Sequence, residues 1–252
     1  MRTRQSFQNF QVDHMTLLVQ PQMYNVAFVA FHAIFGIGPD DLLYEKRKTW
    51  SAKEGEQSMT FAVRLGDGQD QDSRLNHTVM AIVQPSEPKN QSSHVREMLD
   101  GHSAAAHWQH VALRTSDLLA FHKHALDRGV QFITPILKDA HEDLIQVFSG
   151  EWFFPGIKAS GLFFEFLQRK PSEEHLQKLQ SQNRELWFRD KTFLGLYEEK
   201  EREYQTGKVT PFLKDEVFNR LRSEFGQKKL WEISDKDLDR AEQIMLELGG
   251  KR

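Results

Sequence analysis

Three residues of this 252-residue chain are of types that could share a metal ion. Glu165 is the only polar residue between positions 162 and 167, a run rich in aromatics that predicts a buried strand. A carboxylate there needs an arginine, backbone amides or a metal as its partner. His14 and His110 each follow the first residues of a predicted strand. Two imidazoles and one carboxylate suit Fe(II), although zinc, manganese and nickel also bind imidazole.

The elements around these residues repeat one pattern. The first copy is predicted as a strand at 11–20, a helix at 23–35, and strands at 42–50, 59–65 and 76–83. The second copy is predicted as a strand at 108–115, a helix at 118–128, and strands at 130–134, 144–148 and 162–168. Gly36 and Gly129 are predicted to end the helices, and Ser116-Asp117 to cap the second. Two β-α-β-β-β units in tandem place His14 and His110 at equivalent positions, which favours a shared site.

The rest of the chain divides into a connection and a tail. Residues 84–103 are polar and are predicted to connect the two units. From residue 171 onward the composition predicts helices at 171–189, 197–205, 212–225 and 235–248. We therefore expect an α+β domain over 10–170 and a helical extension over 171–252. The extension could cover a sheet face, mediate self-association or bind a partner.

Composition excludes several classes of function. The chain has no cysteine, so disulfides, thiolate metal sites and cysteine nucleophiles are excluded. Its net charge of −3 provides no basic field for nucleic acid. The longest apolar stretch, residues 26–37, is too short to span a bilayer, and the first eight residues lack the apolar run of a signal peptide. We expect a cytoplasmic protein that binds neither nucleic acid nor membranes.

Several stretches together resemble the C-terminal catalytic half of 4-hydroxyphenylpyruvate dioxygenase. The most specific are Gln-His-Val-Ala-Leu at 109–113 and the Glu-x-x-Gln-Arg ending at 165–169. The others are Val-Asp-His at 12–14, Arg-Gly-Val-Gln-Phe at 128–132 and Ile-Gln-Val-Phe at 145–148. That enzyme family belongs to the vicinal oxygen chelate superfamily, with glyoxalase I, extradiol dioxygenases and bleomycin-resistance proteins. The resemblance covers roughly residues 10 to 200.

The resemblance implies a fold and a reaction. The fold would be a half-open mixed β-barrel of paired βαβββ modules, the vicinal oxygen chelate fold. Fe(II), or another divalent metal, would be held by His14, His110 and Glu165. The enzyme would be an oxidoreductase, a dioxygenase that oxidises an aromatic 2-oxo acid with O2 and loss of CO2. Gln109 and Gln146 would be catalytic, with Gln146 holding the substrate or oxygen intermediates, and the chain would form a homodimer.

The resemblance also points to residues that line the substrate pocket. His94 stands where the family has a substrate-contacting glutamine in Ser-Gln-Ile-Gln. Phe188 and Phe193 keep the aromatics of the family's Gly-Phe-Gly-x-Gly-Asn-Phe motif, but its glycines and asparagine are absent here. The sequence thus predicts a retained metal site beside an altered substrate pocket.

Two alternatives stay open. The first is another metal-dependent enzyme of this fold, an extradiol dioxygenase or a glyoxalase-like isomerase. The second is a binding protein that holds a small molecule without chemistry. Oxygen consumption with Fe(II) separates the dioxygenases from the isomerase, which needs no O2 and tolerates zinc or nickel.

Overall fold

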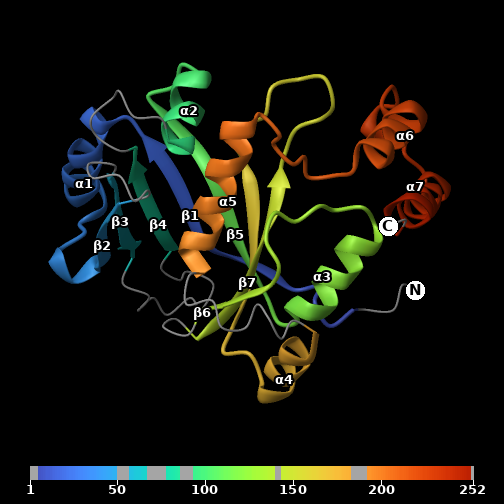
Figure 1. Cartoon of the computed structure of the whole chain (residues 1–252), viewed down its shortest axis with the longest axis horizontal. Coiled ribbons are helices and arrows are strands. Elements are labelled where there is room, and N and C mark those ends of the chain that lie inside the picture. The colour runs from blue at the N-terminus through green and yellow to red at the C-terminus, as the bar shows by residue number, and fades with distance from the viewer. Residues whose placement is uncertain are drawn as a thin grey trace. The chain divides into compact units, whose positions relative to one another are not determined.

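The computed structural model describes residues 5–49, 57–66, 78–85, 93–139, 143–182 and 192–250 (Figure 1). The described residues form eight strands: β1 (Phe10–Val19), β2 (Leu42–Thr49), β3 (Gln57–Leu65), β4 (Thr78–Gln84), β5 (Ala106–Thr115), β6 (Leu137–Asp139), β7 (Leu144–Glu151) and β8 (Phe163–Arg169). They also form seven α-helices: α1 (Pro21–Phe35), α2 (His94–Gly101), α3 (Leu118–Asp127), α4 (Glu173–Gln182), α5 (Thr192–Thr206), α6 (Asp215–Phe225) and α7 (Asp235–Gly249). None of these helices has the length and apolar character needed to cross a membrane.

The strands form a mixed sheet in the order β2-β3-β4-β1-β5-β8-β7-β6. β1 pairs with β4 in parallel, whereas β2–β3, β3–β4, β6–β7 and β7–β8 are antiparallel. The order has two ends, β2 and β6, so the sheet is not closed. The α+β class and the tandem arrangement predicted from the sequence are confirmed.

Contacts group the chain into two compact units. Unit 1 falls within Met1–Phe10, Thr115–Thr192 and Val209–Arg252, and unit 2 within Gln11–Arg114 and Phe193–Lys208. The expected boundary between residues 170 and 171 stays a prediction. Each unit is described separately below.

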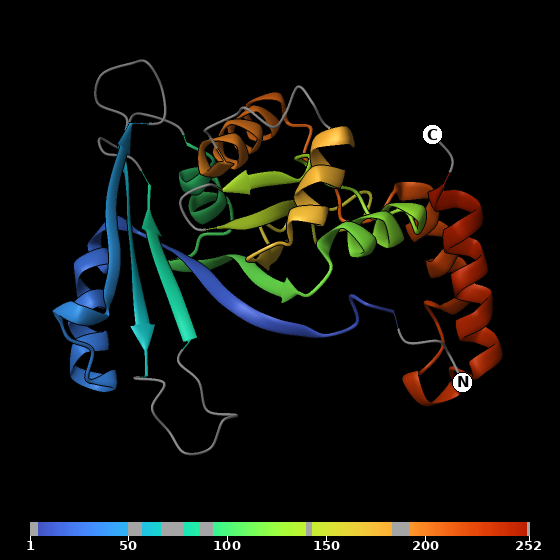
Figure 2. The ribbon, with the colours of Figure 1, turned by 90° about the horizontal axis from the view of Figure 1, so that it is seen from below.

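In unit 2, α1 covers one side of strands β2 to β4 (Figure 2). Pro21 occupies the first turn of α1, where its missing N–H costs no hydrogen bond. Gly36 ends the helix in the left-handed conformation, with φ of 69°, and its N–H donates to the His32 carbonyl. The helix closes over a buried cluster formed by Val19, Tyr24, Ile37, Phe61, Val63 and Ile82.

The opposite face of β1 packs against two helices, α2 and α5. Leu18 and Val83 form a buried cluster with Val95, Met98 and Leu99 of α2 and with Tyr197 of α5. The prediction of a polar connection over 84–103 is therefore wrong in its second part. Val95, Met98 and Leu99 have helical spacing, but a helix this short depends on tertiary packing for its stability. The 3.2 Å bond from the Arg96 N–H to the Ser93 hydroxyl caps α2.

In unit 1, α3 begins at the predicted Leu118 and ends at Asp127, one residue before the predicted end. The Asp117 carboxylate accepts the Ala120 N–H at 3.0 Å, and Gly129, with φ of 82°, follows the last turn. The strand predicted at 130–134 is wrong. Val130 and Phe132 make only isolated bridges, to Leu213 and Ser149, and the strand of this region is β6. Pro135 lies at this point of the chain and has no N–H to donate to a strand partner.

The chain returns to β7 just before the last two helices. Glu151 exchanges backbone hydrogen bonds with Thr210 and Phe212, and the Lys214 N–H donates to the Gly129 carbonyl. The β7–β8 register shifts between Phe148 and Glu151, which leaves Gly150 facing the returning segment. The helices α6 and α7 that follow pack against each other, as Figure 2 shows, and the Ser234 side chain caps the start of α7.

Candidate metal centre

His14 lies in the middle of β1 with its ring held by the residue before it. Alternation along β1 places His14, Thr16 and Leu18 on one face, the face packed by α2 and α5. The Nδ1 atom of His14 lies 3.1 Å from the buried Asp13 carboxylate. Because a carboxylate only accepts, Nδ1 carries the proton and Nε2 presents a lone pair.

His110 repeats this arrangement on β5. Its Nδ1 lies 3.1 Å from Oε1 of Gln109, again the preceding residue, and the ring is buried. Burial, followed by the neighbouring His14, lowers the pKa of His110 well below its usual value. The imidazole is therefore neutral at neutral pH, which is the form that binds metals. The Thr16 hydroxyl lies 3.0 Å from its Nε2.

The two Nε2 atoms face each other at 3.3 Å, with the rings nearly perpendicular at 83°. Two nitrogens at about 2.1 Å from one metal, with tetrahedral or octahedral angles, lie about 3.0 to 3.4 Å apart. The pair thus has the spacing of two ligands of one ion. Each ring also has the partner on its second nitrogen that fixes the tautomer of a metal-binding histidine.

Glu165 is buried in β8 of unit 1, where it lies opposite Phe148. Gln146 is opposite Leu167, two positions along the same pair of strands. Cross-strand partners point to the same face, and so do residues two apart. Glu165 and the buried Gln146 therefore lie on one face of β7–β8, one diagonal step from each other.

His14, His110 and Glu165 are a possible set of metal ligands, and each offers one ligand atom. Two neutral nitrogens and one carboxylate oxygen match the donor set expected for a divalent metal.

The remaining predicted site residues differ in how far the structure describes them. His94 opens α2, is buried, and lies with its Nε2 3.4 Å from the Gln109 Nε2. Phe188 lies outside the described residues. Phe193 falls within α5, and its side chain also lies outside them. The roles of Gln109, Gln146 and these three residues stay predictions.

Gln168, part of the most specific motif of the resemblance, has a clear structural role. Its Oε1 accepts the Leu118 N–H at the start of α3, and its Nε2 lies 3.0 Å from Nδ1 of His175 on α4. The side chain thus joins β8 to two helices of unit 1.

We expect Gln168→Ala to lower the free energy of unfolding by about 1 to 2 kcal/mol, since it leaves a helix-initial N–H without this acceptor. Urea denaturation measures the change. The control is Gln177→Ala, at an exposed position of α4, which should lower the free energy of unfolding by about 0.5 kcal/mol or less. Metal affinity of folded Gln168→Ala should equal that of the wild type; a large drop would assign Gln168 to the metal centre.

Asp13 and Glu201 are site residues that sequence reasoning did not select. Asp13 fixes His14, and Glu201 on α5 binds His94. The sequence does carry a signal for Asp13. A polar side chain directly precedes each histidine, Asp13 before His14 and Gln109 before His110. No local signal marks Glu201, which is 107 residues from His94.

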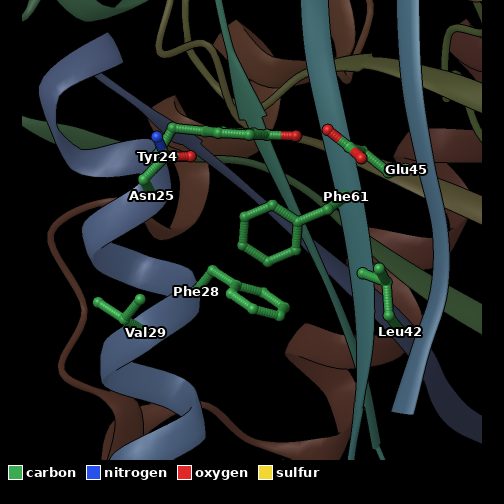
Figure 3. A pocket seen from close by; sticks show the side chains of 7 residues that line it. All are labelled: Tyr24, Asn25, Phe28, Val29, Leu42, Glu45 and Phe61. Carbon is green, nitrogen blue, oxygen red and sulfur yellow. The ribbon is translucent and has the colours of Figure 1, made fainter. Parts of the chain in front are cut away.

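Two apolar cavities lie away from these residues. One of about 300 Å³ lies in unit 2 between α1 and the sheet, lined by Tyr24, Asn25, Phe28, Val29, Leu42, Glu45 and Phe61 (Figure 3). The rings of Tyr24 and Phe28 pack edge-on against Phe61 at 4.9 and 5.6 Å. The other, of about 220 Å³, lies in unit 1 beside Trp152 and Phe212. Neither is lined by a predicted site residue.

Comparison with known proteins identifies the fold. No family model matches the chain, and no curated protein matches it. A mutant of 4-hydroxymandelate synthase from Streptomyces coelicolor superposes with a TM-score of 0.54 at 18% identity, covering 77% of this chain and 54% of that one. The chain thus spans about half the length of that protein.

Smaller proteins match more weakly. Methylmalonyl-CoA epimerase from Mycobacterium tuberculosis gives a TM-score of 0.41 at 18% identity, covering 70% of this chain and 97% of that one. The first of these likenesses confirms the vicinal oxygen chelate fold predicted from the sequence. At this identity the likeness concerns the fold and not the activity.

Proposed function

We propose that this chain is a metal-dependent enzyme of the vicinal oxygen chelate fold, an Fe(II) dioxygenase that oxidises an aromatic 2-oxo acid with O2 and loss of CO2. The observation that carries the proposal is the pair of facing Nε2 atoms, 3.3 Å apart, whose Nδ1 atoms are both occupied by acceptors. Such a pair, joined by the Glu165 carboxylate, would make the two-histidine, one-carboxylate set of non-haem Fe(II) oxygenases. We propose a cytoplasmic homodimer, as expected from the sequence.

The charge of the ligand set supports a 2-oxo acid substrate. Two neutral imidazoles and one carboxylate leave a divalent ion with one positive charge, which complements the single negative charge of a 2-oxo acid. Three protein ligands leave coordination positions open for substrate and dioxygen. The bound metal would supply the redox chemistry between them.

The protein would orient the reactants and keep the ligands in their binding form. Asp13 and Gln109 hold the protons of His14 and His110 at Nδ1, away from the metal. Gln146, on the same face as Glu165, would donate its amide hydrogen bonds to substrate or oxygen. Gln109 would be catalytic together with Gln146, and His94, Phe188 and Phe193 would line the substrate pocket.

The test is anaerobic loading with Fe(II) followed by a panel of aryl and alkyl 2-oxo acids under O2. We expect equal amounts of O2 consumed and CO2 released, with aryl acids preferred, and no turnover by Glu165→Gln. Turnover of catechols instead would assign extradiol cleavage. Isomerase activity with zinc or nickel and no O2 would assign a glyoxalase-like enzyme. Ligand binding that persists unchanged in Glu165→Gln, without turnover, would identify a binding protein.

A further inference from the structure

We propose that Glu201 and His94 are positioning residues that set, through the Gln109 amide, the tautomer in which His110 presents Nε2 to the metal. The inference rests on the proposed metal site and concerns side chains of unit 2 only. It links a carboxylate on α5 to a ligand on β5 by three consecutive hydrogen bonds.

The first bond defines the state of His94. One carboxylate oxygen of Glu201 lies 2.8 Å from the backbone N of His94 and 3.3 Å from its Nδ1. Burial acts to raise the pKa of Glu201, but the hydrogen bonds from the side chain and backbone of His94 outweigh it and lower the pKa. Glu201 is therefore ionised at neutral pH and only accepts, so Nδ1 of His94 carries a proton.

The second bond orients an amide. The Nε2 atom of His94 faces Nε2 of Gln109 at 3.4 Å, and because an amide nitrogen only donates, the His94 Nε2 is the acceptor. The NH2 group of Gln109 donates here. In the opposite amide orientation the Gln109 oxygen would face the lone pair of His94 Nε2, and two acceptors form no hydrogen bond. The His94 ring is held in place by α2 and by the Tyr197 ring, whose centroid is 4.8 Å away.

The third bond acts on the metal ligand. With its NH2 group directed at His94, Gln109 turns Oε1 toward Nδ1 of His110, at 3.1 Å. An amide oxygen accepts, so Nδ1 of His110 carries the proton and its lone pair stays on Nε2, facing His14. Asp13 fixes the tautomer of His14 directly, whereas Glu201 fixes the tautomer of His110 through His94 and Gln109.

A purely structural role for Glu201 and His94 would be to hold α2 against α5. That role predicts a change in stability but no change in the tautomer of His110. The tautomer can be measured without metal, by long-range ¹H–¹⁵N correlation spectra of protein labelled in its histidines. Metal affinity is measured separately, by titration with Co(II) and its visible absorbance.

The test uses the full chain, two disruptive variants and two matched controls. Glu201→Ala and His94→Leu should each raise the population of the Nε2–H tautomer of His110. Each should also weaken Co(II) binding about 10-fold, which is in the range measured when the hydrogen-bond partner of a metal ligand is removed. His94→Gln should restore both, since an amide can accept from Gln109 and donate to Glu201. Glu199→Ala, which removes a half-buried carboxylate of the same helix that pairs with Arg202, should bind Co(II) and keep the His110 tautomer as the wild type does.

The outcomes separate this inference from the proposed function. If Glu201→Ala and His94→Leu keep the wild-type tautomer of His110 and bind Co(II) equally well, the positioning role is wrong and the metal site stands. If the wild type binds no Co(II), the proposed function fails. The tautomer spectra then still show whether Glu201 and His94 set the tautomer of His110. Unfolding midpoints of each variant identify any change that comes from lost structure.

Discussion

Replacing His110 with alanine is expected to abolish stoichiometric binding of a divalent metal, with a loss of affinity of more than about 100-fold. Changes in residues that only contact a ligand already cost about 10- to 100-fold, and His110 would itself be one of three ligands. The measurement is Co(II) or Fe(II) titration under anaerobic conditions, followed by calorimetry. The expected variant remains folded and shows no absorbance from bound Co(II).

The matched control is His107→Ala, which removes the same residue type from the same strand. His107 donates Nδ1–H to the Trp108 carbonyl, and its ring stacks on His102 at 4.7 Å. Its removal should leave metal affinity unchanged. A loss confined to His107→Ala would place the metal at His102 and His107. Equal and weak binding by both variants and the wild type would contradict a metal site at His14 and His110.

Gly150→Ala is expected to lower the free energy of unfolding by about 3 kcal/mol, near the upper range for a forced steric change. A methyl group there would come within 2.4 Å of the Pro211 carbonyl oxygen and 2.7 Å of that of Thr210. Both are backbone atoms held by the hydrogen bonds between Glu151 and this segment, so neither can rotate away. Urea denaturation measures the effect.

Gly38→Ala is the control for Gly150→Ala. A methyl group at Gly38 meets only one side-chain oxygen at 4.0 Å, and its φ of −115° suits any residue. We expect a change of less than about 1 kcal/mol. Equal effects of the two substitutions would contradict the close approach of 210–211 to β7. The alanine at 150 should also disturb Glu165, since the bulge adjoins its cross-strand partner Phe148.

Local pattern determined most of the strands and helices and the types of the candidate metal ligands. Alternation and apolar runs predicted β1, β5, β7 and β8, because one or both of their faces are buried. Gly36, Gly129 and Asp117 marked helix ends, since capping depends on nearby backbone groups. The tandem order of elements placed His14 and His110 at equivalent positions.

Tertiary structure alone decided which elements pack together. The short helix α2 is stabilised by contacts of Val95 and Leu99 with a cluster that includes Tyr197, more than 90 positions away. Residues 130–134 have a strand-like composition, but Val130 and Phe132 find only single bridge partners. Such choices depend on distant neighbours, so a local window cannot predict them.

Sequence and tertiary structure likewise each determined a part of the chemistry of the candidate site. The sequence by itself supplied two imidazoles and a carboxylate, and with them the class of metal that the site suits. Only the folded chain decided which nitrogen of each ring faces its partner, because that depends on Asp13, Gln109, His94 and Glu201. A histidine tautomer is set by the hydrogen bond on its other nitrogen, and in His110 that bond traces back to a carboxylate on α5.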